Sequence, residues 1–206
     1  DLATLIGYYG FKNPTPIVPG GEASGKVVAA GPGIMASYFL GKRVVCSGWG
    51  IGGGVWSEYG VKSVKGGVLP LKKSLSLEQG AMSIINPLTA TAFIDIAKTK
   101  RHKSILLTAA ASTLGRMVNR LGRHEGIQII NIVRRETHVE LLKAEGADLV
   151  LNSNQAGFDQ QLLEVCHQTK TRLAFDAVSG QLTNKLLKAM PPNSKVTVFS
   201  ALSKQD

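Results

Sequence analysis

The sequence predicts an α/β protein in which a small β domain precedes a Rossmann-type doubly wound parallel sheet. Residues 1–85 contain short extended runs broken by glycine and proline, whereas helical and strand patterns alternate from residue 86 onward. Residues 104–109 and 127–133 are apolar without polar alternation, as in parallel strands that are buried on both faces. We therefore expect two domains, residues 1–85 and 86–206.

In the first region, residues 26–30 and 43–46 are predicted to be strands of a twisted β domain. Glu22 lies among three nearby glycines, which favours a structural role at a turn over a catalytic one. Asn86 and Pro87 are typical of an N-cap followed by the first helical residue, so they predict the start of a helix.

The first βαβ unit of the second region carries a small-residue turn. After the strand at 104–109, Ala110, Ser112 and Gly115 have the spacing of a variant G-x-G-x-x-G fingerprint. A helix follows, with apolar residues at helical spacing up to Gly122 and Gly126, and then the strand at 127–133. Small side chains let a pyrophosphate approach the N–H groups of a helix N-terminus. The sequence therefore predicts a dinucleotide site formed by the following turn residues: Ala110, Ser112, Thr113, Leu114 and Gly115.

Two arginines, Arg134 and Arg135, follow the second strand about 20 residues beyond the turn. At this position an Asp or Glu binds the ribose hydroxyls of NAD, whereas an Arg accommodates the 2′-phosphate of NADP. The pair therefore predicts NADP(H). The alternative is that both arginines are solvated surface charges.

Three further strands and three helices complete the predicted sheet. Thr137 and Glu140 suggest a capping box for a helix that runs to Gly146. Strands are expected at 148–152, 173–178 and 195–202, and helices at 158–167 and 181–190, the last stopped by two prolines. Five strands joined by right-handed crossovers give an open doubly wound sheet. Val178 and Ser179, after the fourth strand, are expected to contact the cofactor through their backbone.

The composition narrows the classes of function. The net charge is +10, and residues 98–135 hold nine Lys or Arg against Glu125 alone. A positive field around a phosphate-rich cofactor explains this cluster better than specific nucleic-acid binding, because no nucleic-acid-binding motif is present. No segment is apolar over a membrane-spanning length. The two cysteines, Cys46 and Cys166, lack a metal-binding or disulfide pattern, and the four histidines lack ligand spacing and are interpreted as solvated. The histidines are His102, His124, His138 and His167.

Taken in order, several segments resemble the medium-chain dehydrogenase/reductase superfamily, in which a GroES-like catalytic domain precedes a Rossmann domain. These segments are residues 19–31, 41–45, 54–59, 86–90, 108–115 and 176–180. Zinc-dependent members place a zinc-ligating histidine before the glutamate that corresponds to Glu22, but Gly21 stands there, and the structural-zinc cysteines are missing. The chain thus resembles the zinc-free quinone oxidoreductase and 2-enoyl thioester reductase branch, and no metal is expected.

This resemblance implies NADPH-dependent hydride transfer to an activated C=C bond, in a 2-enoyl thioester or an enone, or to a quinone. Tyr9, in Gly7-Tyr8-Tyr9-Gly10, matches the proton-donating tyrosine of enoyl thioester reductases, although a tyrosine packed on a loop is an equal alternative. Thr89 matches the threonine beside the nicotinamide. The alternative function is a non-catalytic homologue that serves as a structural subunit of a larger assembly.

The resemblance also bears on partners and completeness. Relative to that family, the chain lacks a sixth Rossmann strand and the returning C-terminal segment, so we expect a partial GroES-like domain and a portion of a longer chain. A small-molecule substrate and a homodimer, or a place in a larger assembly, are expected. The basic pI of about 9.8 suits either a cytoplasmic or a mitochondrial matrix protein.

Overall fold

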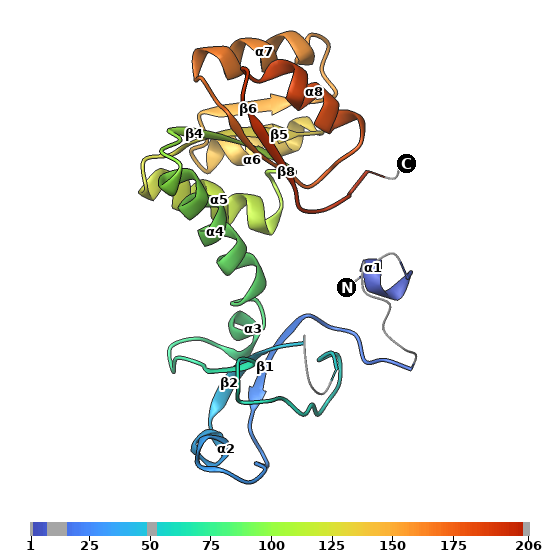
Figure 1. Ribbon diagram of the computed structural model, residues 1–206, viewed down its shortest axis with the longest axis vertical. Helices are drawn as coiled ribbons and strands as arrows, with labels where there is room; N and C mark the ends of the chain where they lie inside the picture. The colour runs from blue at the N-terminus through green and yellow to red at the C-terminus, as the bar shows by residue number, and fades with distance from the viewer. Residues whose placement is uncertain (1, 8–15, 49–52, 204–206) are drawn as a thin grey trace. The chain divides into compact units, whose positions relative to one another are not determined.

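The computed structural model describes residues 2–7, 16–48 and 53–203, which form two compact units (Figure 1). The first unit extends to Asn86 and the second begins at Pro87. Each unit has a sheet of its own, three-stranded in the first and five-stranded in the second. The mixed α/β class expected from the sequence is confirmed.

The first unit contains an antiparallel sheet in the order β1-β2-β3, formed by Glu22–Lys26, Arg43–Ser47 and Val68–Pro70. Short helices accompany it: α1 (Leu2–Leu5), α2 (Ile34–Phe39) and α3 (Leu77–Gly80). The strand expected at 43–46 is confirmed. The strand expected at 26–30 is wrong in position, because β1 pairs with β2 from Glu22 opposite Ser47 to Lys26 opposite Arg43. Beyond Lys26 only Val27 keeps backbone hydrogen bonds to the β2 side, and the chain then leads toward α2.

Glu22 holds the start of the long helix α4 (Ile85–Thr99). Its Oε2 accepts hydrogen bonds from the backbone N–H groups of Ile84 and Ile85, both at 3.0 Å. A carboxylate is favourable there because the helix N-terminus carries partial positive charge. The expected start of this helix is therefore wrong. The helix begins at Ile85, so Asn86 and Pro87 both lie inside it.

The second unit is built on a parallel sheet in the order β6-β5-β4-β7-β8. The strands in chain order are β4 (Ser104–Thr108), β5 (Gln128–Val133), β6 (Leu149–Asn152), β7 (Leu173–Asp176) and β8 (Lys195–Val198). All five residues of β4 are buried, as the unbroken apolar run predicts. The order reverses between β4 and β7, so the doubly wound topology is confirmed, and ligands bind such sheets at the carboxyl ends of the strands at this point.

Helices cover both faces of the parallel sheet (Figure 1). The core on one face joins α4, α5 (Thr113–His124) and α6 (Glu136–Ala144) to alternate strand residues such as Ile105 and Phe175. The core on the other face joins α7 (Phe158–Gln168) and α8 (Gln181–Ala189) to strand residues such as Leu106 and Ile130.

Several element ends differ from the predictions. The helix α6 begins at Glu136, so Thr137 lies in its first turn and the expected capping box is wrong; Arg135 occupies the N-cap without a side-chain hydrogen bond. Gly122 lies inside α5 instead of ending it. The last strand ends at Val198. Beyond it, the N–H of Leu202 donates to Ala177 O at 2.9 Å, so the segment after β8 lies at the carboxyl end of β7.

Candidate functional site

The turn between β4 and α5 is closed by its own small residues. Ser112 is the N-cap of α5, and its Oγ accepts a hydrogen bond from the N–H of Gly115 at 3.2 Å. Ala109 has a left-handed backbone with φ of 50°. A Cβ at Gly115 would lie 2.2 Å from the carbonyl oxygen of Ala110, so only glycine fits. The helix N-terminus therefore approaches the end of β4 closely, and Thr113 and Leu114 supply its first backbone amides, which have no intrahelical partner.

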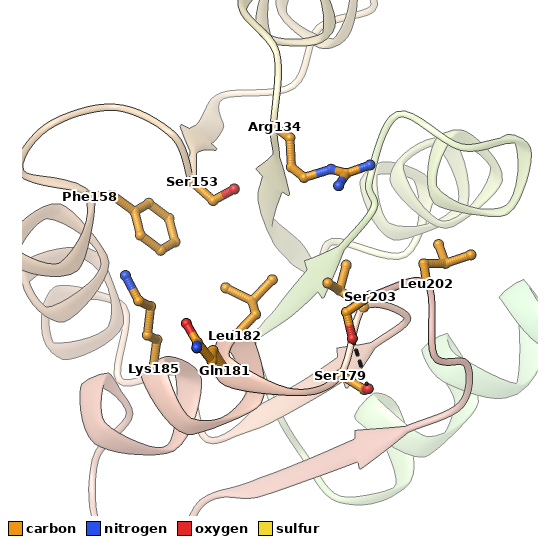
Figure 2. A pocket seen from close by; sticks show the side chains of 10 residues that line it. Arg134, Ser153, Phe158, Ser179, Gln181, Leu182, Lys185, Leu202 and Ser203 are labelled. Carbon is orange, nitrogen blue, oxygen red and sulfur yellow. Dashed lines mark hydrogen bonds between the residues drawn. The ribbon is translucent and has the colours of Figure 1, made fainter. Parts of the chain in front are cut away.

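Two adjoining cavities lie at the carboxyl ends of the strands. The first, of about 290 Å³, extends from Ser112 to Arg135 and His138. The second, of about 460 Å³, extends toward Phe158 and Lys185 (Figure 2). Both are lined by a common set of residues from four different loops and from helix α8 (Gln181–Ala189): Arg134, Ser153, Val178, Leu182 and Leu202. Together the cavities form one cleft at the topological switch point of the sheet.

The end of β5 places both arginines at this cleft. Arg134 and Arg135 are exposed, and the backbone around them is held by the loop after β6. Asn154 Nδ2 donates to Arg134 O at 3.0 Å, and the N–H of Ser153 donates to Val133 O at 2.8 Å. None of the described residues that line the two cavities is an Asp or a Glu. The cleft is thus positively charged where it meets the end of β5.

Asp176 holds the loop after β7, whose residues Val178 and Ser179 line the cleft. This buried carboxylate accepts hydrogen bonds from Thr108 Oγ1 at 2.7 Å and Thr183 Oγ1 at 2.6 Å. It also accepts from the backbone N–H groups of Val178 at 2.8 Å and Ser179 at 3.3 Å. These bonds tie β4, the loop after β7 and α8 together. They hold Ser179 at a left-handed φ of 65° and fix the backbone of the expected cofactor contacts.

An ion pair stabilises the helices behind the turn. Arg116 donates through Nε to Glu145 Oε2 at 3.1 Å, and its Nη2 also contacts Glu145 Oε1. The hydrogen bonds from Arg116, together with its charge, hold the pKa of Glu145 below its usual range. Arg116 thus joins α5 to the end of α6.

The expected site residues differ in where they lie relative to the cleft. Ser112, Arg134, Arg135, Val178 and Ser179 line the cleft. Ala110 and Gly115 are buried beneath it, and Thr113 and Leu114 lie in the first turn of α5. Thr89 lies in α4 and does not line either cavity among the described residues. Tyr9 lies outside the described residues.

Sequence reasoning missed several lining residues. His138, interpreted from the sequence as solvated, is half-buried and lines the cleft beside the arginine pair. Ser153, Leu182 and Lys185 were not considered. Ser153 could have been found, because it directly follows a predicted parallel strand and such strands end at one edge of the sheet. Leu182 and Lys185 lie on α8 and required the packing of that helix.

The fit of a dinucleotide can be judged from these residues. The turn is small and presents helix N-terminal amides, as a pyrophosphate requires. The cationic end of β5 suits an additional phosphate on the ribose, and the described residues that line this cavity include no carboxylate of the kind that selects NAD. Within the described ranges, no three His, Cys, Asp or Glu side chains gather closely enough to hold a metal ion. None of the helices in the described part of the chain has the length and apolar character needed to cross a membrane.

Two family models match this chain. Residues 1–73 match the alcohol dehydrogenase GroES-like domain, and residues 113–206 match the zinc-binding dehydrogenase family. The chain is 27% identical over 210 residues to a mitochondrial enoyl-[acyl-carrier-protein] reductase of Caenorhabditis elegans, covering 100% of the chain and 58% of the relative. It is 28% identical over 210 residues to the enzyme of the same name from Arabidopsis thaliana, covering 100% of the chain and 55% of that relative.

Solved structures have the same fold. A protein assigned as an NADPH:quinone reductase from Mesorhizobium loti is 34% identical with a TM-score of 0.94, covering 100% of this chain and 60% of the other. Quinone oxidoreductase of Escherichia coli, solved in complex with NADPH, is 23% identical with a TM-score of 0.77, covering 97% of this chain and 61% of the other, and shows the fold alone. The chain spans less than two thirds of the length of each of these relatives.

Proposed function

Because the chain belongs to the medium-chain dehydrogenase/reductase superfamily, in its zinc-free quinone oxidoreductase and enoyl thioester reductase branch, we propose that it is an NADPH-dependent reductase. Its hydride acceptor is an activated C=C bond, in a 2-enoyl thioester or an enone, or a quinone. The unit that ends at Asn86 is part of the catalytic domain, and the unit that begins at Pro87 binds the dinucleotide.

One observation carries this proposal. A single cleft at the switch point joins the small-residue turn at Ser112 to the cationic residues Arg134 and Arg135. A pyrophosphate at the α5 N-terminus and a ribose phosphate at the end of β5 are the two anionic groups of NADP(H). We assign Ser112, Thr113 and Gly115 to the pyrophosphate turn and the two arginines to the 2′-phosphate.

Other residues of the chain have supporting roles. Asp176 fixes the loop that presents the backbone of Val178 and Ser179 to the cofactor. Ala110 lies beneath the turn, and Leu114 supplies an amide of the helix N-terminus. The small side chains of the turn leave room for the cofactor.

Bound NADPH would supply hydride to the electron-poor carbon of the substrate. We propose that the Tyr9 hydroxyl then donates a proton, or hydrogen-bonds the carbonyl oxygen, and that Thr89 lies beside the nicotinamide. General acid catalysis of this kind contributes roughly 10²- to 10⁴-fold to a rate. Replacement of Tyr9 by Phe should therefore lower the rate with a short 2-enoyl thioester by about this factor.

The relatives suggest the substrate and the setting. Two are named as mitochondrial enoyl-[acyl-carrier-protein] reductases and one is assigned as an NADPH:quinone reductase. We propose a small-molecule thioester or quinone as substrate, a homodimer or a larger assembly as the functional unit, and a cytoplasmic or mitochondrial matrix location.

A titration of the purified full-length protein with NADPH, followed by nicotinamide fluorescence, tests the cofactor. NADPH should bind at least about tenfold more tightly than NADH, because each charge-assisted hydrogen bond to the 2′-phosphate is worth about one decade or more. The double variant Arg134→Gln, Arg135→Gln should lose this preference. Arg172→Gln, an exposed arginine before β7 at the other end of the sheet, is the matched control and should bind as the parent does.

Activity then separates the two functions. Reduction of a 2-enoyl thioester or a quinone that falls in Tyr9→Phe but not in Tyr8→Phe supports the proton-donor assignment, and equal rates in both would remove it. Absence of binding by either dinucleotide would refute the proposal and favour a non-catalytic structural subunit.

A further inference from the structure

His138 lies beside the arginine pair in the cleft. The cavity of about 290 Å³ is lined by Arg134, Arg135 and His138, which lie within five residues of one another in the sequence. Histidine is the side chain that ordinarily exchanges its proton between pH 5 and pH 8. The cavity therefore combines two permanent cations with one group whose charge depends on pH.

The local backbone explains why these three side chains meet. Arg135 is the N-cap of α6, and the N–H of His138 donates to Arg135 O at 3.0 Å. Arg135 and His138 are three residues apart at the start of α6 and so lie on one side of its first turn. Arg134 precedes the N-cap and lines the same cavity. The half-buried imidazole is therefore held by a regular helix and not by a loop.

The other charged groups around His138 are engaged elsewhere or lie outside the cavity. On α6, the Glu136 carboxylate accepts hydrogen bonds from Asn152 Nδ2 at 3.1 Å and Gln155 Nε2 at 3.0 Å, and Glu140 is exposed and does not line the cavity. On α5, Arg116 pairs with Glu145 at the opposite end of α6.

The strands beside the cavity add no charge. β5 and β6 contain no charged residue, and Asp148, before β6, does not line the cavity. The turn before α5 and the loop after β6 contribute the neutral side chains of Ser112 and Ser153. No described carboxylate of the lining therefore competes for a protonated imidazole.

We propose that His138 is a third ligand of the 2′-phosphate and binds it most strongly when the imidazole is protonated. This inference rests on the proposed function, because it requires the phosphate at Arg134 and Arg135. A phosphate ester carries a charge between −1.5 and −2 near neutral pH, and a third cationic donor adds a charge-assisted hydrogen bond. The preference for NADPH over NADH should therefore increase as the pH falls from 8.5 to 6.5.

The test is the ratio of NADPH to NADH dissociation constants at pH 8.5 and 6.5, measured by fluorescence titration of the full-length protein. For a partly exposed ion pair, a protonated imidazole should strengthen NADPH binding by up to about fivefold. His138→Gln should abolish this pH dependence. His138→Lys should bind NADPH equally tightly at both pH values, because its charge is permanent in this range. His167→Gln, an exposed histidine at the end of α7, is the matched control and should behave as the parent.

The outcomes separate this inference from the function it rests on. If NADPH is preferred but His138→Gln keeps the pH dependence of the parent, the role of His138 is refuted and the cofactor assignment stands. If NADPH is not preferred at either pH, the cofactor assignment fails and the inference fails with it. Recovery of tight binding at pH 8.5 in His138→Lys would show that the charge, and not the shape of the imidazole, acts on the phosphate.

Discussion

The closest backbone approach in the turn gives a direct test of the site: Gly115→Ala. The added Cβ would lie 2.2 Å from Ala110 O, 2.6 Å from Ala110 C and 2.7 Å from Ala110 Cα. All three are backbone atoms, so no side chain can rotate away. The start of α5 and the end of β4 must separate by about 1 Å to reach ordinary contact.

The expected cost follows from this geometry. Overpacking of a fitted interior typically costs 1–3 kcal/mol, and a contact with backbone should lie near about 3 kcal/mol. For a protein of this size, that corresponds to a fall of about 6–12 °C in Tm. The affinity for NADPH should fall at least about tenfold, because displacement of α5 moves the amides that we assign to the pyrophosphate.

Thermal unfolding and NADPH titration measure the two effects, with two matched variants. Gly122→Ala places its Cβ 2.7 Å from Cδ1 and 2.9 Å from Cγ1 of Ile129, and 3.1 Å from Ile127 O. The two nearest atoms belong to a side chain that can shift, so the loss should be smaller than for Gly115→Ala. Gly31→Ala meets no atom within 4 Å and should change stability by less than about 0.5 kcal/mol. If Gly115→Ala has the same Tm and the same affinity for NADPH as the parent, the close approach of α5 to the turn is refuted.

Three further predictions follow from buried and paired groups. Asp176→Asn should lower the free energy of unfolding by about 1–3 kcal/mol in denaturant titration. The amide NH₂ replaces one carboxylate oxygen and cannot accept a hydrogen bond, so the bond from Thr108 or the one from Thr183 is lost. The pKa of Glu145 is depressed in the folded protein by Arg116, so its contribution to stability is present at neutral pH and lost as the pH falls through the folded pKa. Glu145→Gln should flatten this acid-side loss in unfolding curves measured below about pH 5. Burial raises the pKa of the Cys166 thiol to about 11, so alkylation at pH 8 should not modify Cys166 until the protein unfolds, as mass spectrometry would show.

The parallel sheet was predictable because its central strands, β4, β5 and β7, are buried on both faces. Ile105 to Leu107 pack into two cores on opposite sides, which requires an unbroken apolar run that a sequence displays directly. The helix starts were less predictable, since capping depends on groups that are distant in the sequence. The amides at Ile84 and Ile85 are satisfied by Glu22, 62 and 63 residues earlier, so no local pattern could reveal this cap.

The lining of the candidate cleft was predictable where it depends on a single turn and not where several loops converge. Ser112, Arg134 and Arg135 could be named from their distance to a strand end. Leu182 and Leu202 reach the same cleft from α8 and from the segment after β8. Their placement depends on the strand order and on the backbone hydrogen bond from Leu202 to Ala177. The pattern at 195–202 predicted one long strand and gave no sign of this bond.

The variant fingerprint shows which of its small residues must be glycine. Ala109 has a φ of 50°, a conformation that costs an alanine on the order of 1 kcal/mol, yet alanine occupies the position. The folded protein keeps this strained conformation because the surrounding turn fixes the backbone angles at Ala109. At Gly115 any side chain would overlap the carbonyl of Ala110, and no compensation can remove that overlap without moving the helix. In this turn, glycine is required at Gly115, where two backbone segments touch, whereas an alanine adopts the left-handed backbone angle at Ala109. The close approach of helix and strand is therefore the stronger constraint on residue type in this turn.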